Sequence, residues 1–171
     1  NGWNLLQNGT VLQQTLRNYD NTHNTTTCPK ATTVQRDENA TQVTEKLDYL
    51  NRTSEERIWM SFNSTFQFYN ESTSPYSLMN TTAESGGPPA SYRFLYVDDN
   101  CTVMQLVFVN YSGRVLPRPE QGVLCGIWVK PDAIGSESPN CNSTFYEMCN
   151  NTGVHSVYSA TECTSKEELS E

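Results

Sequence analysis

Six cysteines constrain this chain more than any other feature of its sequence, because disulfide bonds fix which parts of a fold lie together. They stand at Cys28, Cys101, Cys125, Cys141, Cys149 and Cys163. The number is even, no two form a Cys-x-x-Cys pair, and few histidines lie nearby, so the spacing favours disulfides over a zinc site. A reducing cytosol would keep such thiols open, so the set predicts a secreted, extracellular protein. The sequence alone leaves the pairing of the cysteines open.

The acceptor pattern for N-linked glycans, Asn-x-Ser/Thr, recurs along the whole chain. Ten strong sequons stand at Asn8, Asn24, Asn39, Asn51, Asn63, Asn70, Asn80, Asn110, Asn142 and Asn150. An eleventh, at Asn100, is the weakest because a cysteine is its middle residue. An attached glycan must reach solvent, so the sequons predict surface positions and a glycoprotein.

Length and charge narrow the class of protein. The 171 residues suit one domain, which we place at residues 1–163, followed by a polar acidic tail at residues 164–171 that we expect to fray. The net charge is −8 and the basic residues form no run, so nucleic acid and anionic membranes are poor partners. No apolar stretch suits a membrane span and no signal-like leader opens the chain, so we expect the mature form of a secreted protein.

Short runs of β-branched and aromatic residues, separated by turn-forming clusters, predict a mainly β protein. The predicted strands are Val11–Tyr19, Cys28–Arg36, Thr41–Leu50, Glu56–Phe62, Thr65–Tyr69, Tyr76–Asn80, Ser91–Val97, Cys101–Asn110 and Gly122–Lys130. We expect one of these to be an extension or a break of a neighbour, and the eight that remain would make a barrel able to hold a small ligand. Two helices are predicted, a short one before Gly9 and a second over Asn142–Asn150.

Side-chain alternation along the strands predicts which residues face the interior. If Cys101 and Cys125 point outward to bridge a helix on the barrel wall, a neighbour such as Thr102 points inward. A glycan on Asn63 would have to point outward, so the even residues of its strand, such as Met60 and Phe62, would point inward. The lumen predicted in this way is apolar and aromatic, and its residues are Met60, Phe62, Tyr92, Phe94, Met104, Leu106, Phe108, Leu124 and Trp128.

Motifs for catalysis are absent from the sequence. There is no Gly-x-Ser-x-Gly, P-loop, Gly-x-Gly-x-x-Gly or His-Glu-x-x-His pattern. The two histidines, His23 and His155, are interpreted as surface residues, and the Asp98-Asp99 pair is ordinary turn chemistry between strands. We therefore expect no enzyme, no cofactor and no metal site.

Several stretches of the chain together resemble the tick salivary lipocalins. The residues that carry the resemblance are Leu95-Tyr96-Val97-Asp98-Asp99-Asn100-Cys101-Thr102-Val103, Cys125-Gly126-Ile127-Trp128-Val129, then Cys141, Phe145 and Cys149, with Trp3, Leu5, Thr15, Tyr19-Asp20, Cys28 and Cys163. The resemblance covers most of the chain. It implies an eight-stranded up-and-down antiparallel barrel with a short N-terminal helix, a C-terminal helix packed outside, and a cavity for a small host molecule. It also implies the bridges Cys28–Cys163, Cys101–Cys141 and Cys125–Cys149.

Two departures from that family bear on the ligand. In its histamine- and serotonin-binding members, an acidic residue directly follows the cysteine of the Asp-Asp-Asn-Cys stretch, and a glutamate stands two positions before the tryptophan. The matching residues here are Thr102 and Gly126. A buried cation without a paired charge is heavily penalised, so the loss of both acids argues against an amine ligand. If an amine did bind, Asp48 and Glu45 would be the first lumenal carboxylates to consider.

The resemblance and the apolar lumen together predict a monomeric scavenger. Its ligand would be a hydrophobic host mediator, such as a leukotriene, a fatty acid or a sterol, and its removal would suppress host inflammation or immunity during blood feeding. One alternative is a cholesterol or fatty-acid carrier that acts through its surface on an immune cell or complement protein, and another is an amine scavenger. An immunoglobulin-type module is a third alternative, but the clustering of cysteines after residue 100 does not fit it.

A fatty-acid ligand would need a hydrogen-bond donor for its carboxylate. Arg57 and Arg93 are candidates on predicted strands, although alternation places both on the face opposite the lumen. Tyr49, Tyr96 or Lys46 could equally serve.

Overall fold

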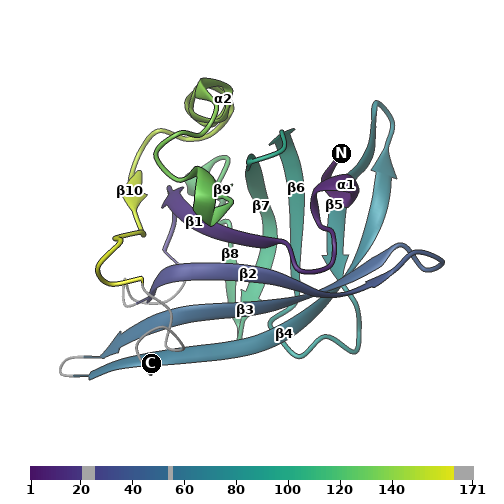
Figure 1. The fold of residues 1–171 in the computed structure, drawn as a ribbon, viewed down its shortest axis with the longest axis horizontal. Coiled ribbons are helices and arrows are strands. Elements are labelled where there is room, and N and C mark those ends of the chain that lie inside the picture. The colour runs from purple at the N-terminus through teal and green to yellow at the C-terminus, as the bar shows by residue number, and fades with distance from the viewer. Residues whose placement is uncertain (21–25, 54–55, 164–171) are drawn as a thin grey trace.

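The structure, a computed structural model, describes residues 1–20, 26–53 and 56–163. Its main feature is an antiparallel β-sheet that closes on itself, because β9 pairs with both β1 and β7 (Figure 1). The closed ring of eight strands consists of β1 (Val11–Arg17), β2 (Thr26–Asp37), β3 (Gln42–Thr53), β4 (Glu56–Glu71), β5 (Ser74–Thr81), β6 (Ala90–Val97), β7 (Cys101–Tyr111) and β9 (Cys125–Val129). The predicted mainly β barrel is therefore confirmed.

Strand β4 explains why nine predicted strands become eight. It runs without interruption through the two segments predicted as Glu56–Phe62 and Thr65–Tyr69, so one is the extension of the other, as expected. Two short strands outside the ring were not predicted: β8 (Arg114–Leu116) pairs with β7, and β10 (His155–Ser156) pairs with β1. Short 3-10 turns occur at Pro119–Gln121 and Pro131–Ala133. The tail at 164–171 and His23 lie outside the described residues.

The N-terminal helix α1 (Gly2–Leu5) closes one end of the barrel with apolar side chains. Trp3 and Leu6 are buried in the same cluster as Phe68, and the Trp3 and Phe68 ring centroids lie 5.3 Å apart, edge to face. Arg36 of β2 holds the helix in place, because its guanidinium lies 3.6 Å from the Trp3 ring centroid and donates a 2.9 Å hydrogen bond to the Leu6 carbonyl. Gly2 permits the close approach, since the ring of Phe94 occupies the space that a Cβ would need.

The C-terminal helix α2 (Pro139–Met148) packs on the outside of β7 and β9 (Figure 1). It begins before the predicted Asn142, because the Ser138 side chain caps its first turn and a proline at the first helical position needs no hydrogen-bond acceptor. Phe145 is completely buried with Val103 and Ile127. No helix among the described residues is long and apolar enough to cross a bilayer.

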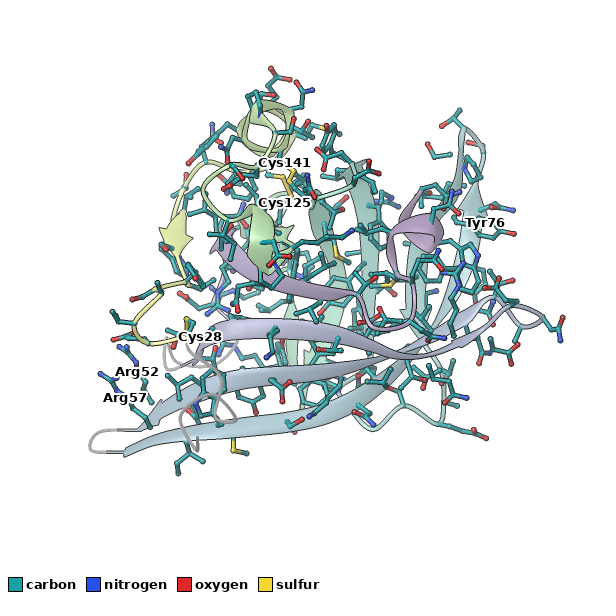
Figure 2. The ribbon with its side chains drawn as sticks, in the orientation of Figure 1. Cys28, Arg52, Arg57, Tyr76, Cys125 and Cys141 are labelled. Carbon is teal, nitrogen blue, oxygen red and sulfur yellow. A yellow bond between two sulfur atoms is a disulfide. The ribbon has the colours of Figure 1, made fainter. Side chains whose placement is uncertain are left out.

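Three disulfides fasten these outer segments to the barrel (Figure 2). The pairs are Cys28–Cys163, Cys101–Cys141 and Cys125–Cys149, which are the pairs that the family resemblance implied. The last two join α2 to β7 and to β9, and the first joins β2 to the end of the described chain. Both Cys101 and Cys125 therefore face outward, which is the orientation that the assignment of the inner face assumed.

A bulge in β7 changes which residues face the interior. Tyr92 of β6 pairs with Leu106 but its neighbour Ser91 pairs with Phe108, so Val107 is an extra residue in β7. Beyond it the alternation is reversed, because Val109 is fully buried while Phe108 is 37% exposed. Phe108 also does not line the cavity inside the barrel, so the prediction that it lines the lumen is wrong.

The sequons lie on different parts of the described surface. Asn8, Asn39, Asn63, Asn70, Asn100 and Asn142 are exposed, whereas Asn51, Asn80, Asn110 and Asn150 are partly buried. The Asn150 amide nitrogen, the atom that a glycan would modify, donates a 2.7 Å hydrogen bond to the Gln121 carbonyl. Asn24 lies outside the described residues, and glycan occupancy stays a prediction.

Candidate ligand-binding site

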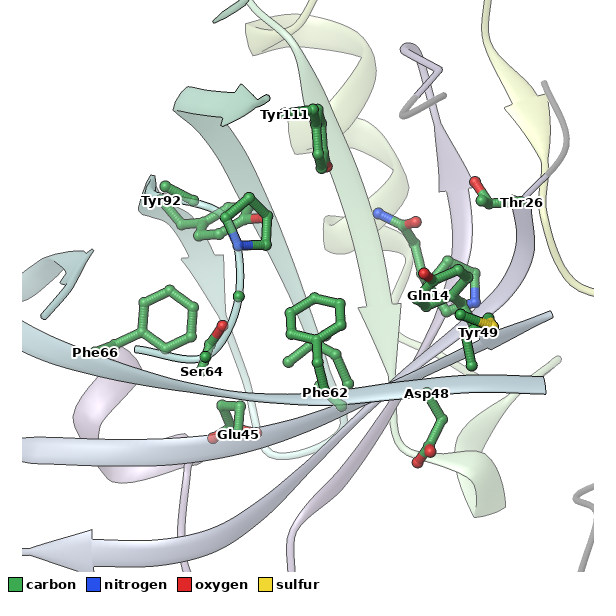
Figure 3. Close-up of a pocket in the computed structure, with 18 of the residues that line it drawn as sticks. Gln14, Thr26, Glu45, Asp48, Tyr49, Phe62, Ser64, Phe66, Tyr92 and Tyr111 are labelled. Carbon is green, nitrogen blue, oxygen red and sulfur yellow. The ribbon is translucent and has the colours of Figure 1, made fainter. Parts of the chain in front are cut away.

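A cavity of about 940 Å³ occupies the barrel interior. Leu6, which follows α1, contributes to its wall, and the β5–β6 and β7–β8 connections line its other end through Gly87 and Ser112. Figure 3 shows Phe62 and Phe66 of β4 with Tyr92 of β6 and Tyr111 of β7 around this space. The apolar and aromatic residues of the wall include Leu12, Ala31, Leu47, Tyr49, Met60, Phe62, Phe66, Met79, Tyr92, Met104 and Trp128.

Five of the predicted ligand contacts line this cavity, namely Met60, Phe62, Tyr92, Met104 and Trp128. Three others, Phe94, Leu106 and Leu124, are buried but pack against neighbouring side chains instead of lining the cavity. Alternation therefore placed these eight on the inner face of the barrel, where Met60 is still 40% exposed, but it could not separate wall packing from cavity surface.

Arg93 and Tyr96, which were also predicted to contact ligand, do not line the cavity. Arg93 forms a two-point ion pair with Glu71, with nitrogen–oxygen distances of 2.8 and 3.0 Å. Tyr96 donates a 3.0 Å hydrogen bond to Asp98. The register of β6 shifts between Phe94 and Tyr96, so Tyr96 pairs with Val103 and joins the cluster beneath α2.

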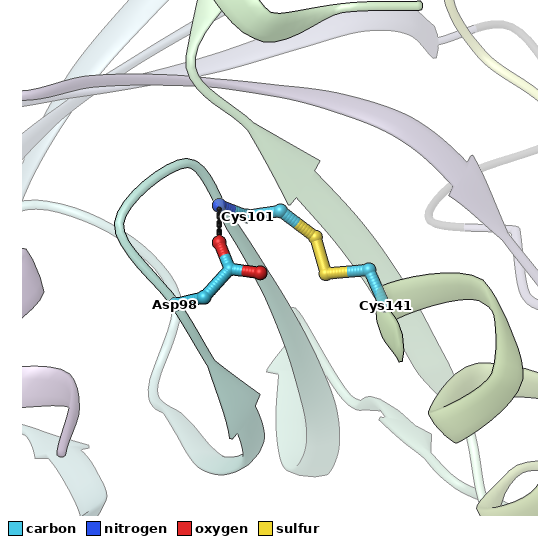
Figure 4. A group of neighbouring side chains, drawn as sticks. All are labelled: Asp98, Cys101 and Cys141. Atoms are coloured by element: carbon cyan, nitrogen blue, oxygen red, sulfur yellow. Dashed lines mark hydrogen bonds between the residues drawn. A yellow bond between two sulfur atoms is a disulfide. The ribbon is translucent and has the colours of Figure 1, made fainter. Parts of the chain in front are cut away.

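The Asp98-Asp99 segment is a turn, as the sequence predicted. One carboxylate oxygen of Asp98 accepts hydrogen bonds from the backbone nitrogens of Asn100 at 2.8 Å and Cys101 at 2.9 Å, and Figure 4 shows the second of these. The sulfur atoms of Cys101 and Cys141 lie nearby, but their disulfide bond leaves no thiolate to bind a metal.

Thr102 and Gly126, the two positions where the family resemblance implies acids in amine-binding members, carry no acid here. Thr102 is completely buried, and its hydroxyl donates a 2.7 Å hydrogen bond to the Tyr96 carbonyl. At Gly126 the amide of Gln14 fills the space where a side chain would begin. Neither position therefore offers a carboxylate.

Glu45 supplies a carboxyl group in the cavity wall (Figure 3). It is 3% exposed, and one of its oxygens lies 2.6 Å from the Thr33 hydroxyl. Its other oxygen, Oε2, is buried and has no hydrogen-bond partner among the described residues. Burial raises the pKa of Glu45 to about 7, although the Thr33 hydrogen bond lowers it in part. The signal in the sequence was period-two alternation, because Val43 and Leu47 share its face.

A second polar group lies behind the cavity wall. Arg17 is 1% exposed, and its guanidinium donates a 2.9 Å hydrogen bond to the Thr26 carbonyl. Its carbon Cζ lies 5.8 Å from the centroid of the Tyr19 ring. Burial lowers the pKa of Arg17 and raises that of Tyr19. Tyr19 and Gln14 line the cavity, but Arg17 behind them does not. The described cavity wall includes neither an arginine nor a lysine.

The raised pKa of Glu45 makes stability depend on pH. As the pH rises from about 4.5 to 7, the unfolded state loses this proton before the folded state does, so the wild-type protein loses stability across that window. Glutamine cannot ionise. We expect Glu45→Gln to be more stable than the wild type by roughly 3 kcal/mol at pH 8, with a much smaller difference at pH 4. Urea unfolding at both pH values measures this, and an equal difference at the two would contradict it.

The closed barrel with a ligand-sized interior, capped by one helix and flanked by another, places this chain among the lipocalin-like binding proteins. The family model of the tick histamine binding protein matches residues 2–165, and the chain belongs to this family.

Comparison with solved structures agrees with this fold. Japanin from Rhipicephalus appendiculatus bound to cholesterol matches with a TM-score of 0.59 and 18% sequence identity, over 90% of this chain and 94% of that chain. A search of curated protein sequences finds no match.

Proposed function

We propose that this chain is a secreted protein that binds a small hydrophobic host molecule in its barrel and holds it without chemical conversion. The observation that supports this most directly is a cavity of about 940 Å³ lined largely by aliphatic and aromatic side chains. Membership in a ligand-binding tick family supports the small-molecule partner. Three disulfides are consistent with secretion. Sequestration of a mediator would lower its free concentration and so dampen host inflammation or immunity.

The charges around the cavity favour a neutral lipid over a fatty acid. The described lining residues include the acids Glu45 and Asp48 but no arginine or lysine. A ligand carboxylate deep in this space would lack a cation and face a buried acid, which is costly. A leukotriene or fatty acid would therefore keep its head at the open end, whereas a sterol could enter completely. The cholesterol bound to Japanin agrees with this preference.

A biogenic amine is the second candidate, and Glu45 is the observation that favours it. An ammonium group could pair with this carboxylate inside an aromatic-lined space. Thr102 and Gly126 provide no second acid, however, so we expect histamine and serotonin to bind more weakly than a lipid.

Native mass spectrometry of the deglycosylated protein tests the proposed function. A retained lipid-sized mass, or uptake of added cholesterol or leukotriene by an empty chain, would support it. Quenching of Trp128 fluorescence in a titration would place the ligand in the cavity, and a Trp128→Phe variant identifies that signal against Trp3 and Trp59. If no lipid binds to the folded protein while histamine binds with submicromolar affinity, the lipid proposal is wrong and the amine is the ligand.

A further inference from the structure

Glu45 belongs to a small polar group in an otherwise apolar part of the barrel. Its cross-strand neighbours on the two sides are Thr33 of β2 and Ser64 of β4, and all three side chains are buried. Two residues further along β3 and β4, the next cross-strand pair on the same face is Val43 and Phe66, and both pack in the cluster that contains Trp3. The polar group therefore lies toward the end of the cavity that α1 closes.

The carboxyl group of Glu45 is only half satisfied by the protein. One oxygen is paired with Thr33, and Oε2 has no partner among the described residues although it is buried. A buried polar atom without a hydrogen bond is unfavourable, so the site gains from any ligand group that can bond to it. Glu45 also lines the cavity, so a bound molecule can reach it.

From this geometry we propose that Glu45 is the polar anchor of the cavity, and that it binds the hydroxyl group of a neutral lipid such as a sterol at the closed end. The inference rests on the proposed function and specifies the orientation of the ligand in it. A hydroxyl group suits the site because it can donate and accept, and so pairs with a protonated or an ionised carboxyl. The surrounding aliphatic and aromatic wall matches the rest of a sterol.

Glu45 is the group of this site that changes its charge near neutral pH, because the groups that face it do not. From the adjacent strands it meets the uncharged Thr33 and Ser64. The other titratable residues of the cavity wall are Tyr19, Asp48, Tyr49, Tyr92 and Tyr111. Burial raises the pKa of Tyr19, Tyr92 and Tyr111 above the usual tyrosine value, so these keep their protons. Asp48 is a partner of Lys46, with a nitrogen–oxygen distance of 3.9 Å.

The sign of the pH dependence distinguishes the ligand classes. A neutral lipid that covers Glu45 removes it further from water, which disfavours the ionised carboxylate more than one hydrogen bond from an uncharged hydroxyl favours it, so the pKa of Glu45 rises above the value of about 7 in the empty protein. Affinity for a neutral lipid should then fall as the pH rises above 7, by at most about tenfold per pH unit. A cationic ligand prefers the ionised carboxylate, so its affinity should rise over the same range.

The test compares cholesterol with its analogue lacking the 3-hydroxyl group, each titrated into the full chain between pH 5.5 and 8.5. We expect the wild type to prefer cholesterol by about tenfold at pH 6 and to bind it progressively less well above pH 7. Glu45→Gln should keep the preference and lose the pH dependence. Glu45→Leu should bind both sterols equally.

Three results would overturn the proposal that Glu45 anchors the ligand. They are equal binding of the two sterols by the wild type, an unchanged preference in Glu45→Leu, or a cholesterol affinity that rises with pH. If the wild type binds both sterols without preference, the anchor is wrong but the proposed function still holds. If the folded wild type binds neither sterol, a sterol is not the ligand of the proposed function either. The isosteric Glu45→Gln keeps the test valid if Glu45→Leu does not fold, and far-ultraviolet circular dichroism checks both variants.

Discussion

Phe62→Asp is expected to lower lipid affinity about a hundredfold or more, because it places an unpaired charge in an apolar cavity, which costs several kcal/mol. Phe62 lines the cavity and contacts Tyr49 edge to face, with ring centroids 6.2 Å apart. Its side chain is not fully buried, so the variant should still fold. Cholesterol titration by fluorescence or calorimetry measures the loss.

The matched control is Phe108→Asp, the same substitution at a ring that is 37% exposed on β7. We expect this variant to bind lipid as well as the wild type does. The pair tests the register of the barrel, because a simple alternation without the bulge would place Phe108 inside. If Phe108→Asp abolishes binding in a folded protein and Phe62→Asp does not, the cavity described above is not the lipid site.

The inner face of β7 can be predicted from the sequence only as far as the bulge. Up to Leu106 the alternation assigns the inner face correctly, because the outward Cys101 is fixed by its bridge to α2. The following residues Val107, Phe108 and Val109 are all apolar, so no polar residue shows that the alternation reverses. Strand type and number follow from local pattern, whereas a one-residue bulge depends on how β7 pairs with β6.

Glu45 illustrates a different limit. Alternation with Val43 and Leu47 places it inside, but from sequence alone it is only a reserve carboxylate for an amine ligand. Charged residues are rarely buried without a partner, which argues against such an assignment from sequence. Its role becomes visible only when the structure shows an oxygen without a partner in the cavity wall.

Removal of the Cys28–Cys163 bridge is expected to cause the largest loss of stability. The bridge closes a loop with a sequence separation of 135 residues, and the chain-entropy model assigns about 5 kcal/mol to a loop of that length. The double variant Cys28→Ala/Cys163→Ala should therefore unfold at a much lower denaturant concentration. Equilibrium unfolding with the other two bridges intact measures the difference.

The Cys125–Cys149 bridge provides the comparison, because its sequence separation is only 24; both of its cysteines are buried, as Cys28 is, whereas Cys163 is partly buried. The same model assigns it about 3.5 kcal/mol, so its double alanine variant should be the more stable of the two by about 1.5 kcal/mol. Each double variant removes two sulfur atoms, and the partly buried Cys163 makes the packing loss of the first variant the smaller one, so a larger total loss there would come from loop closure. The opposite ranking would show that attachment of α2 to β9 contributes more to stability than closure of the long loop does, since Cys149 follows α2 directly and Cys125 begins β9.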